Sequence, residues 1–213
     1  LIMAPLNGVE AEDMVASVYG WDNLLYSLAK VSVVMKDGQA SFKPDAARIE
    51  FGEKRNRIIT PRVRVLKELF ESAGIRCVVP EDMERAIWFK YMCNVSENQS
   101  AAVLGISYGA WRVSGDANFI REALMREVIA VARKKGISLT EEDMEKQVRV
   151  LGAVPPGNKP STLQDIEAGR RTEVEMFGGT MIRMGRELGV PTPYNEMFYH
   201  AIKVLEQKNE GLF

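Results

Sequence analysis

One lysine and two asparagines follow each other at steps of four residues within the segment 88–98. A helix turns about 100° per residue, so each step of four drifts only ~40° and Lys90, Asn94 and Asn98 share one helical face. The flanking residues are almost all apolar, which is typical of a buried helix. Burial can lower the pKa of a lysine by ~3–5 units, which would make Lys90 a usable proton donor near neutral pH. The two amides would add fixed hydrogen-bond donors and acceptors beside it.

A second group of polar residues lies in the segment 161–188. Ser161 and Gln164 have the spacing of a capping box, which predicts the start of a long helix that continues over 161–188. Glu173 borders the apolar stripe of this helix, so we expect it to be partly buried. Gly169 lies one helical step before Glu173 and would leave room for a ligand to approach.

Structural roles are the alternatives for these residues. Lys90 could extend its apolar stem along a helix surface and keep its ammonium in water. Glu173 could form a local ion pair with Arg170, and Ser161 could only satisfy free amides at a helix end.

Composition excludes several classes of function. The chain has 213 residues, of which 46% are hydrophobic and 27% charged, so it is long enough for one large or two modest domains. A net charge of −1 gives no basic footprint for nucleic acid. No apolar run approaches the ~20 residues that span a bilayer and no leader is present, so we expect a cytoplasmic protein without membrane contact. A single histidine, His200, removes any histidine cluster, so no metal site is predicted, and Cys77 and Cys93 are expected to pack as free thiols.

Periodicity predicts a mixed α and β part followed by a helical part. Over 1–80 we expect a strand end at 1–6, a helix at 9–19, a hairpin of 31–35 and 39–42 around Asp37-Gly38, a strand at 48–52, a helix from Thr60-Pro61 to Gly74 and a strand at 75–79. Over 81–213 we expect helices at 81–104 and 117–135, one from Thr140, one from Ser161 and one after 191–195. The apolar opening without a preceding turn suggests a fragment cut inside a domain.

Five segments of the chain, in order and over nearly its whole length, resemble the ketopantoate reductase (2-dehydropantoate 2-reductase) family. They are Asn7-Gly8-Val9, Trp88-x-Lys90-x3-Asn94-x3-Asn98, Ser161-Thr162-Leu163-Gln164-Asp165, Gly169-Arg170-Arg171-Thr172-Glu173 and Gly189-Val190-Pro191-Thr192-Pro193. The resemblance implies the C-terminal part of an NADP-binding Rossmann domain at 1–80 and an all-helical domain at 81–213, similar to that of 6-phosphogluconate dehydrogenase. No G-x-G-x-x-G occurs, so the glycine-rich pyrophosphate site is expected to be missing from this fragment.

The same resemblance implies an activity and a role for each matching residue. The activity is NADPH-dependent reduction of a 2-oxo acid, ketopantoate or a related substrate, to the 2-hydroxy acid in pantothenate biosynthesis. Lys90 would be the general acid. The substrate would be bound by Asn94, Asn98, Ser161 and Asn7. The cofactor would be bound by Asn7, Glu173 and the backbone of Val34, and we expect a homodimer formed through the helical domain.

Two departures from the family pattern bear on the substrate. Tyr108 stands where ketopantoate reductases can present a further substrate asparagine, and Leu6 replaces a glutamine often found before the Asn-Gly pair. Neither change touches the hydride or the proton step. The alternative function is a non-catalytic helical dimerisation or scaffold module that retains the family fold. The joint presence of Lys90, Asn94 and Asn98 favours the enzyme, and a glycine-rich strand, turn and helix upstream of Leu1 would discriminate between the two.

Overall fold

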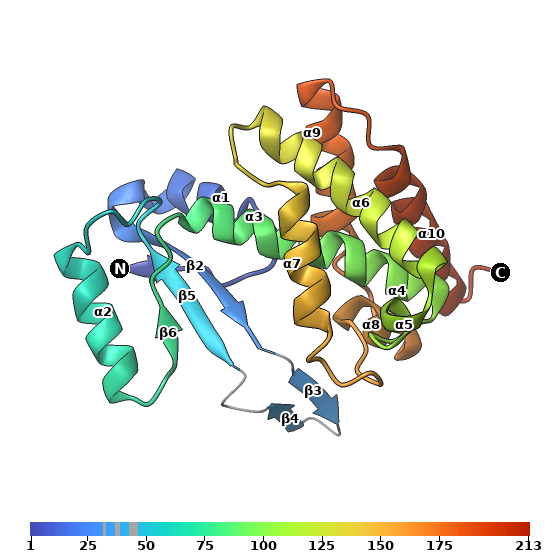
Figure 1. Cartoon of the computed structure of the whole chain (residues 1–213), viewed down its shortest axis with the longest axis horizontal. Helices are drawn as coiled ribbons and strands as arrows, with labels where there is room; N and C mark the ends of the chain where they lie inside the picture. The colour runs from blue at the N-terminus through green and yellow to red at the C-terminus, as the bar shows by residue number, and fades with distance from the viewer. Residues whose placement is uncertain (32, 37–38, 43–46) are drawn as a thin grey trace. The chain divides into compact units, whose positions relative to one another are not determined.

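The computed structural model describes residues 1–31, 33–36, 39–42 and 47–213 (Figure 1). The chain divides into two compact units, Leu1–Ile87 and Trp88–Phe213. The first is mixed α and β and the second is helical in its described residues, as the sequence predicts. The assignment of domains to 1–80 and 81–213 stays a prediction.

A four-stranded sheet forms the centre of the first unit. Its strands are β1 (Ile2–Met3), β2 (Leu24–Lys30), β5 (Arg48–Gly52) and β6 (Cys77–Val78), in the order β1-β2-β5-β6. β1 is parallel to β2, β2 is antiparallel to β5, and β5 is parallel to β6. The sequence analysis did not predict β2, because Leu24, Leu25, Ser27 and Leu28 are all buried and the strand lacks alternation between apolar and polar residues.

Helices and a hairpin complete the first unit. α1 (Ala11–Tyr19) is followed by the 3-10 turn η1 (Trp21–Asn23), and α2 (Pro61–Ser72) covers the sheet through the buried Val63 (Figure 1). Gly20 and Gly74 follow α1 and α2 with φ of 78° and 70°, values that favour glycine. The predicted hairpin is confirmed as β3 (Val33–Lys36) paired with β4 (Gln39–Phe42), although its turn, Asp37-Gly38, lies outside the described residues.

A long helical run opens the second unit. It consists of α3 (Met83–Cys93), the π-helix η3 (Asn94–Asn98) and α4 (Gln99–Leu104), and it ends at Gly105 with φ of 66°. The predicted helix over 81–104 and its glycine stop are therefore confirmed. The π-helix in its middle was not predicted.

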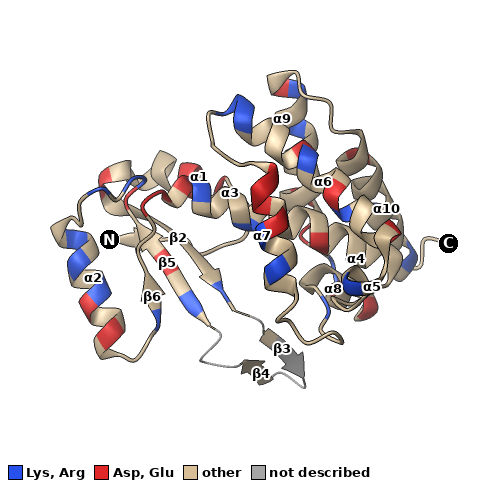
Figure 2. Cartoon of the chain, in the orientation of Figure 1, with Lys and Arg blue, Asp and Glu red and all other residues tan. Residues whose placement is uncertain are grey.

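The remaining described helices of the second unit follow this run. They are α5 (Ala110–Val113), α6 (Gly115–Lys134), α7 (Glu141–Leu151), α8 (Ser161–Glu167), the π-helix η4 (Glu175–Gly179), α9 (Thr180–Leu188) and α10 (Pro193–Asn209). None of the described helices is long and apolar enough to cross a membrane. Along α2 the basic residues precede the acidic ones, and along α6 acidic and basic residues alternate (Figure 2).

Two predictions about the second unit are wrong. The segment 161–188 is not one helix, because α8 ends before Gly169, whose φ of 66° is left-handed, and the chain restarts at η4. The left-handed φ of Gly169 favours glycine at this turn, and a Cβ there would meet no atom within 4 Å; that the position leaves room for a ligand stays a prediction. Ser161 and Gln164 form no capping box, because Ser161 is already the first helical residue.

A buried polar network joins three helices of the second unit. The Glu127 carboxylate accepts hydrogen bonds from the backbone N–H groups of Tyr194 and Asn195, both at 2.9 Å, and so caps the start of α10. The Asn195 amide oxygen accepts from Gln99 Nε2, also at 2.9 Å. This network fixes α4, α6 and α10 to one another.

Candidate functional site

Lys90, Asn94 and Asn98 lie on the helical run that opens the second unit. Lys90 is in the last turn of α3, Asn94 begins η3 and Asn98 ends it; the first two are half-buried and Asn98 is buried. Four residues rotate slightly more than a full turn about the axis of an α-helix. They rotate slightly less than a full turn in a π-helix, in which the hydrogen bonds run from residue i to residue i+5. The step from Asn94 to Asn98 therefore reverses the drift of the step from Lys90 to Asn94. The π-helix brings the predicted face closer to alignment than an α-helix would.

Polar side chains stabilise the π-helix by bonding to its backbone. Ser96 Oγ donates to the carbonyls of Met92 and Cys93, at 2.8 and 3.2 Å. Gln99 Nε2 donates to the carbonyl of Val95 at 2.9 Å, and Ser100 Oγ donates to that of Ser96 at 2.6 Å. These bonds satisfy carbonyls that the change of helical pattern disturbs. π-helices of one turn are frequent at functional sites, and this one holds two of the predicted residues.

The structure brings Asn98 and Ser161 together. Asn98 Oδ1 accepts from Ser161 Oγ at 3.0 Å and from the backbone N–H of Thr162 at 3.1 Å. Because the N–H of Thr162 can only donate, the amide oxygen must face α8 and the NH2 group must point elsewhere. That NH2 group has no acceptor among the described residues. It is a donor held in a fixed direction.

Glu173 lies in the turn between α8 and η4 and is half-buried. Its carbonyl accepts from the N–H groups of Met176 and Phe177, at 3.0 and 3.1 Å, which starts the helical chain of η4. Arg170 does not form the alternative ion pair with Glu173. Its Nε and Nη2 instead donate to Asp165 Oδ1, at 2.9 and 2.7 Å.

The residue before Glu173 anchors this turn to α10. Thr172 donates to Glu206 Oε1 through its N–H and through its hydroxyl, both at 2.7 Å. Burial opposes ionisation of Glu206, yet the bonds from Thr172 and Lys203 leave its pKa below the ordinary value. The backbone on which Glu173 sits is therefore fixed.

A buried charged pair beside the predicted residues was missed in the sequence. Glu97 Oε1 accepts from Gln147 Nε2 at 2.8 Å and lies 4.0 Å from Arg121 Nη1. Burial raises the pKa of Glu97 to about 7, against the opposing effects of Gln147 and Arg121. Arg121 is 1% exposed, donates from Nη2 to Asn118 Oδ1 at 2.8 Å and lies over the ring of Trp111. The signal in the sequence is a charged residue at a position that the helical pattern predicts to be buried, once in each of two helical segments.

Tyr108 is held in a short loop after α4. Its backbone N–H donates to the carbonyl of Asn158 at 2.9 Å, and its ring meets Trp111 edge to face at 5.5 Å. A Cβ on the next residue, Gly109, would lie 2.9 Å from Pro156, so the two loops pack too closely for a side chain there. Burial raises the pKa of the Tyr108 hydroxyl. Tyr108 is thus a neutral hydroxyl on a constrained loop.

Two predicted residues belong to the first unit. Asn7 follows the carboxyl end of β1 and is half-buried, and the next residue, Gly8, has φ of 89°. Val34 lies in β3 opposite Ser41. The prediction that both contact the cofactor stays a prediction.

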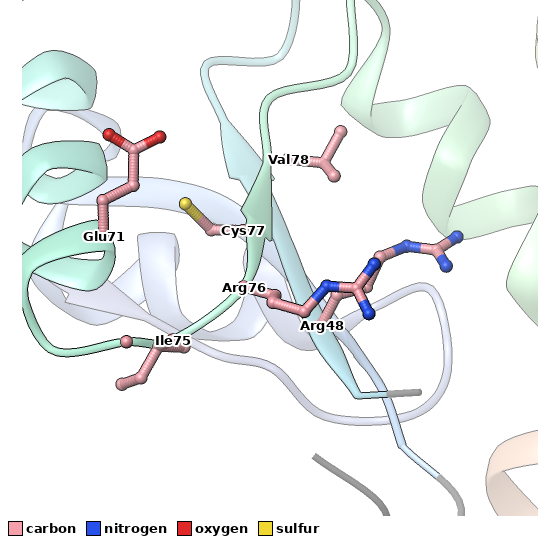
Figure 3. A pocket seen from close by; sticks show the side chains of 7 residues that line it. Arg48, Glu71, Ile75, Arg76, Cys77 and Val78 are labelled. Carbon is pink, nitrogen blue, oxygen red and sulfur yellow. The ribbon is translucent and has the colours of Figure 1, made fainter. Parts of the chain in front are cut away.

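Two surface hollows contain none of the predicted residues. One, of about 390 Å³, lies in the first unit beside β6, and Figure 3 shows Arg48 and Arg76 extending to one side of that strand and the Cys77 thiol pointing toward Glu71 on the other. Burial raises the pKa of this thiol, and both cysteines are free, as predicted. The second hollow, about 400 Å³, is lined by residues of η4, α9 and α10, including the exposed His200. No group of three or more potential metal ligands occurs among the described residues.

Comparison with protein families gives a match over residues 82–206, more than half of the chain. The matching model is described as the C-terminal region of ketopantoate reductase PanE/ApbA. A 2-dehydropantoate 2-reductase of Pyrobaculum aerophilum is 32% identical over 144 residues, which are 68% of this chain and 51% of that protein. The chain thus spans about half the length of this relative.

Solved structures share the fold of nearly the whole chain. A 2-dehydropantoate 2-reductase from Methylococcus capsulatus is 29% identical with a TM-score of 0.81, over 95% of this chain and 64% of that one. A ternary structure of D-mandelate dehydrogenase with NADH and anilino(oxo)acetate has a TM-score of 0.85 at 20% identity, over 98% of this chain and 67% of that one. The second likeness concerns the fold alone.

Proposed function

We propose that this chain, which belongs to the ketopantoate reductase PanE/ApbA family, carries the general acid and the substrate contacts of a nicotinamide-dependent 2-oxo acid reductase. The observation that carries the proposal is the amide of Asn98, held by Ser161 and Thr162 on the same helical run as Lys90. A fixed donor on the same helical run as a half-buried lysine suits a substrate that is an anion and has a carbonyl to reduce.

The proposed chemistry assigns the proton step to Lys90. A bound nicotinamide cofactor supplies hydride to the keto carbon. As the carbonyl oxygen gains negative charge, the Lys90 ammonium stabilises it and transfers a proton from Nζ, and the resulting amine recovers its proton from solvent. A cation interacts with an alkoxide more strongly in a site of low dielectric than in water. The NH2 group of Asn98 and the amide of Asn94 would hold the substrate's oxygens, and Ser161 would contact the substrate while orienting Asn98.

The first unit suits the nicotinamide end of such a cofactor. β1 is parallel to β2, and Asn7 follows its carboxyl end, the edge at which open α/β sheets bind ligands. Glu173 and the backbone of Val34 are the other proposed contacts. The 213 residues contain no G-x-G-x-x-G, so we assign none of them to the pyrophosphate. NADPH is the proposed cofactor and NADH the alternative, since the mandelate dehydrogenase complex holds NADH.

The proposed substrate is ketopantoate or a related 2-oxo acid. Tyr108 is bulkier than an amide and offers a single neutral hydroxyl, which supports a substrate less polar than ketopantoate. Anilino(oxo)acetate, present in the mandelate dehydrogenase structure, is a 2-oxo acid that carries an aromatic ring. A role in pantothenate biosynthesis would follow only if ketopantoate is the preferred substrate.

A homodimer formed through the second unit is proposed as the assembly. α10 exposes the large apolar side chains of Tyr194, Met197 and Val204, which are 47, 68 and 49% exposed. Burying such residues between two copies would remove apolar surface from water. Sedimentation of the full-length gene product would test this; a monomer at micromolar concentration contradicts it.

The test of the proposed function is turnover of a panel of 2-oxo acids by the full-length gene product with NADPH or NADH. Replacing Lys90 by Ala should lower kcat about 10²- to 10⁴-fold and leave cofactor affinity nearly unchanged. Lys146→Ala is the matched control, because Lys146 Nζ lies 5.7 Å from the ring centroid of Phe89, the neighbour of Lys90. Equal turnover by wild type and Lys90→Ala would remove Lys90 from the chemistry. A fully active Lys146→Ala variant would show that loss of charge on this surface is not itself harmful.

A further inference from the structure

Glu97 is a carboxylate buried between three helical elements. It is 4% exposed and lies in η3, directly before Asn98. Its Oε1 accepts from Gln147 of α7 and lies 4.0 Å from Arg121 of α6. A buried ion pair of this kind contributes little to stability compared with apolar residues of similar volume. Its contacts nevertheless fix the direction in which one side of η3 faces.

Glu97 and Asn98 point to different partners from neighbouring positions. Glu97 binds α7 and faces α6, whereas Asn98 accepts two hydrogen bonds from the start of α8. Two adjacent residues anchored in different directions determine the rotation of a helical turn about its axis. A rotation of η3 would lengthen the bonds of Asn98 to Ser161 and Thr162 and turn its free NH2 group away.

We propose that Glu97 is a positioning residue, which holds η3 at the rotation that directs the Asn98 NH2 group toward the 2-oxo acid. The proposal rests on the proposed function, because Asn98 is a substrate contact only if that function holds. Glu97 itself touches no reacting atom. It acts through the adjacent residue.

The charged state of Glu97 decides how firmly it is held. When ionised, it attracts the guanidinium of Arg121, which Asn118 and the ring of Trp111 keep in place. When protonated, it keeps the bond from Gln147 but loses most of this attraction. The other titratable groups facing the pair are Cys93 of α3, Tyr108 after α4, and Glu122 of α6, which acts on Arg121. Burial raises the pKa of Glu97 to about 7, so the charge of this carboxyl group changes between pH 6 and pH 8.

The decisive variant is Glu97→Gln in the full-length gene product. At pH 8 it should raise KM for the 2-oxo acid about tenfold, the effect of losing one directed hydrogen bond, and leave kcat within about twofold. In the wild type KM should rise as the pH falls from 8 to 6, and in Glu97→Gln it should not depend on pH over this range. Glu122→Gln is the matched control: it removes a carboxylate that also acts on Arg121 but pairs with the exposed Arg126, and its KM should match the wild type.

A purely structural role gives a different result. It would lower the active fraction and hence the apparent kcat, with KM unchanged, and that outcome overturns the proposal. If Glu97→Gln does not fold, Gln147→Leu removes the hydrogen bond to Glu97 without removing a charge, and its KM should rise in the same way. An unchanged KM in that variant would also overturn it.

A second readout does not need turnover. The side-chain amide signal of Asn98 in a ¹⁵N NMR spectrum, assigned by Asn98→Asp, should move with pH around neutrality in the wild type and in Glu122→Gln but not in Glu97→Gln. An Asn98 signal insensitive to pH in the wild type overturns the proposal. If the signal moves but no 2-oxo acid is reduced, the coupling of Glu97 to Asn98 stands and only the proposed function fails.

Discussion

The hydroxyl of Tyr91 donates a hydrogen bond to the carbonyl of Phe177 across 2.8 Å. Tyr91 is in the turn before η3 and Phe177 is in η4, so one bond joins the surroundings of the two π-helices. Tyr91 and Phe177 are 1 and 0% exposed, and no water can replace the bond without opening the core.

Replacing Tyr91 by Phe should lower the free energy of unfolding by about 0.5–1.5 kcal/mol, because the buried Phe177 carbonyl loses the Tyr91 hydroxyl and keeps only the backbone N–H of Thr180. Denaturant unfolding followed by circular dichroism measures this. Tyr199→Phe is the control, since its exposed hydroxyl donates to Glu175 of the same π-helix, and it should cost less than about 0.5 kcal/mol. An equal decrease in the free energy of unfolding in the two variants would show that the buried bond to Phe177 contributes no more than an exposed one.

Gly178→Ala should destabilise the second unit. A Cβ at Gly178 would lie 2.5 Å from Gln99 Oε1 and 2.8 Å from the Cβ of Tyr199. The Gln99 amide could move only by breaking its bonds to Val95 and Asn195, and the Tyr199 Cβ moves only with α10. We expect a loss of about 1–3 kcal/mol, as for overpacking of a core. Gly115→Ala, where no atom lies within 4 Å of the new Cβ, should leave stability within about 0.5 kcal/mol. A Gly178→Ala protein as stable as the wild type contradicts this close approach.

Stability should depend on pH through Glu97. Its pKa in the folded protein is about 7, above the ordinary 4.5, so the folded state binds this proton more tightly than the unfolded state does. The stabilisation from this group is complete below about pH 4.5 and is lost as the pH rises through about 7, a change of about 3 kcal/mol. Glu97→Gln has no such proton, so its stability relative to the wild type should increase between pH 5 and pH 8. A constant difference between the two proteins over that range would refute the shifted pKa.

Asn98→Asp separates the acceptor from the donor of this side chain. The carboxylate can still accept from Ser161 and Thr162, but it has no NH2 group and would repel an anionic substrate. We expect KM for a 2-oxo acid to rise at least about tenfold in the folded protein, with some loss of stability because the new carboxylate is buried. The rise in KM would not come from the loss of the bond to Thr162, because the new carboxylate still accepts from the N–H of Thr162. A variant with unchanged KM would remove Asn98 from the substrate site.

The 213-residue chain by itself should bind NADPH weakly or not at all. Dinucleotide affinity in Rossmann folds rests largely on a glycine-rich turn at a helix start, and the sequence contains none. Losing several kcal/mol of phosphate contacts moves a micromolar site to roughly millimolar. Titration of NADPH fluorescence with the chain and with the full-length gene product compares the two. Comparable micromolar binding would place the phosphate site within these residues.

The sequence predicted the elements whose ends are set locally. Gly20, Gly74 and Gly105 all have positive φ and follow helices at or near the predicted positions. β2 was not predicted, because both of its faces are buried and the strand shows no alternation of apolar and polar residues. The π-helices were not predicted, because they depend on side-chain donors such as Ser96 and on packing between helices that are distant in the sequence.

The predicted site residues came from family motifs, which identify residues by position in a pattern. The same motifs could not predict that Ser161 binds Asn98, because the two residues are far apart in the sequence. They also gave no reason to single out Glu97 or Arg121. A buried pair between two helices becomes visible only when both helices are placed in space.

The π-helix η3 makes the chemistry of this chain sensitive to the length of one helix. A π turn accommodates one residue more than an α turn, so deleting any single residue within 94–98 would allow an uninterrupted α-helix. The residues before the deletion would keep nearly the same rotation relative to those after it, because the π turn had already absorbed the extra residue. One further residue added to the run without a second π turn would instead rotate Lys90 by about 100° relative to Asn98, so two proteins with the same residues at the site could differ in whether they are enzymes.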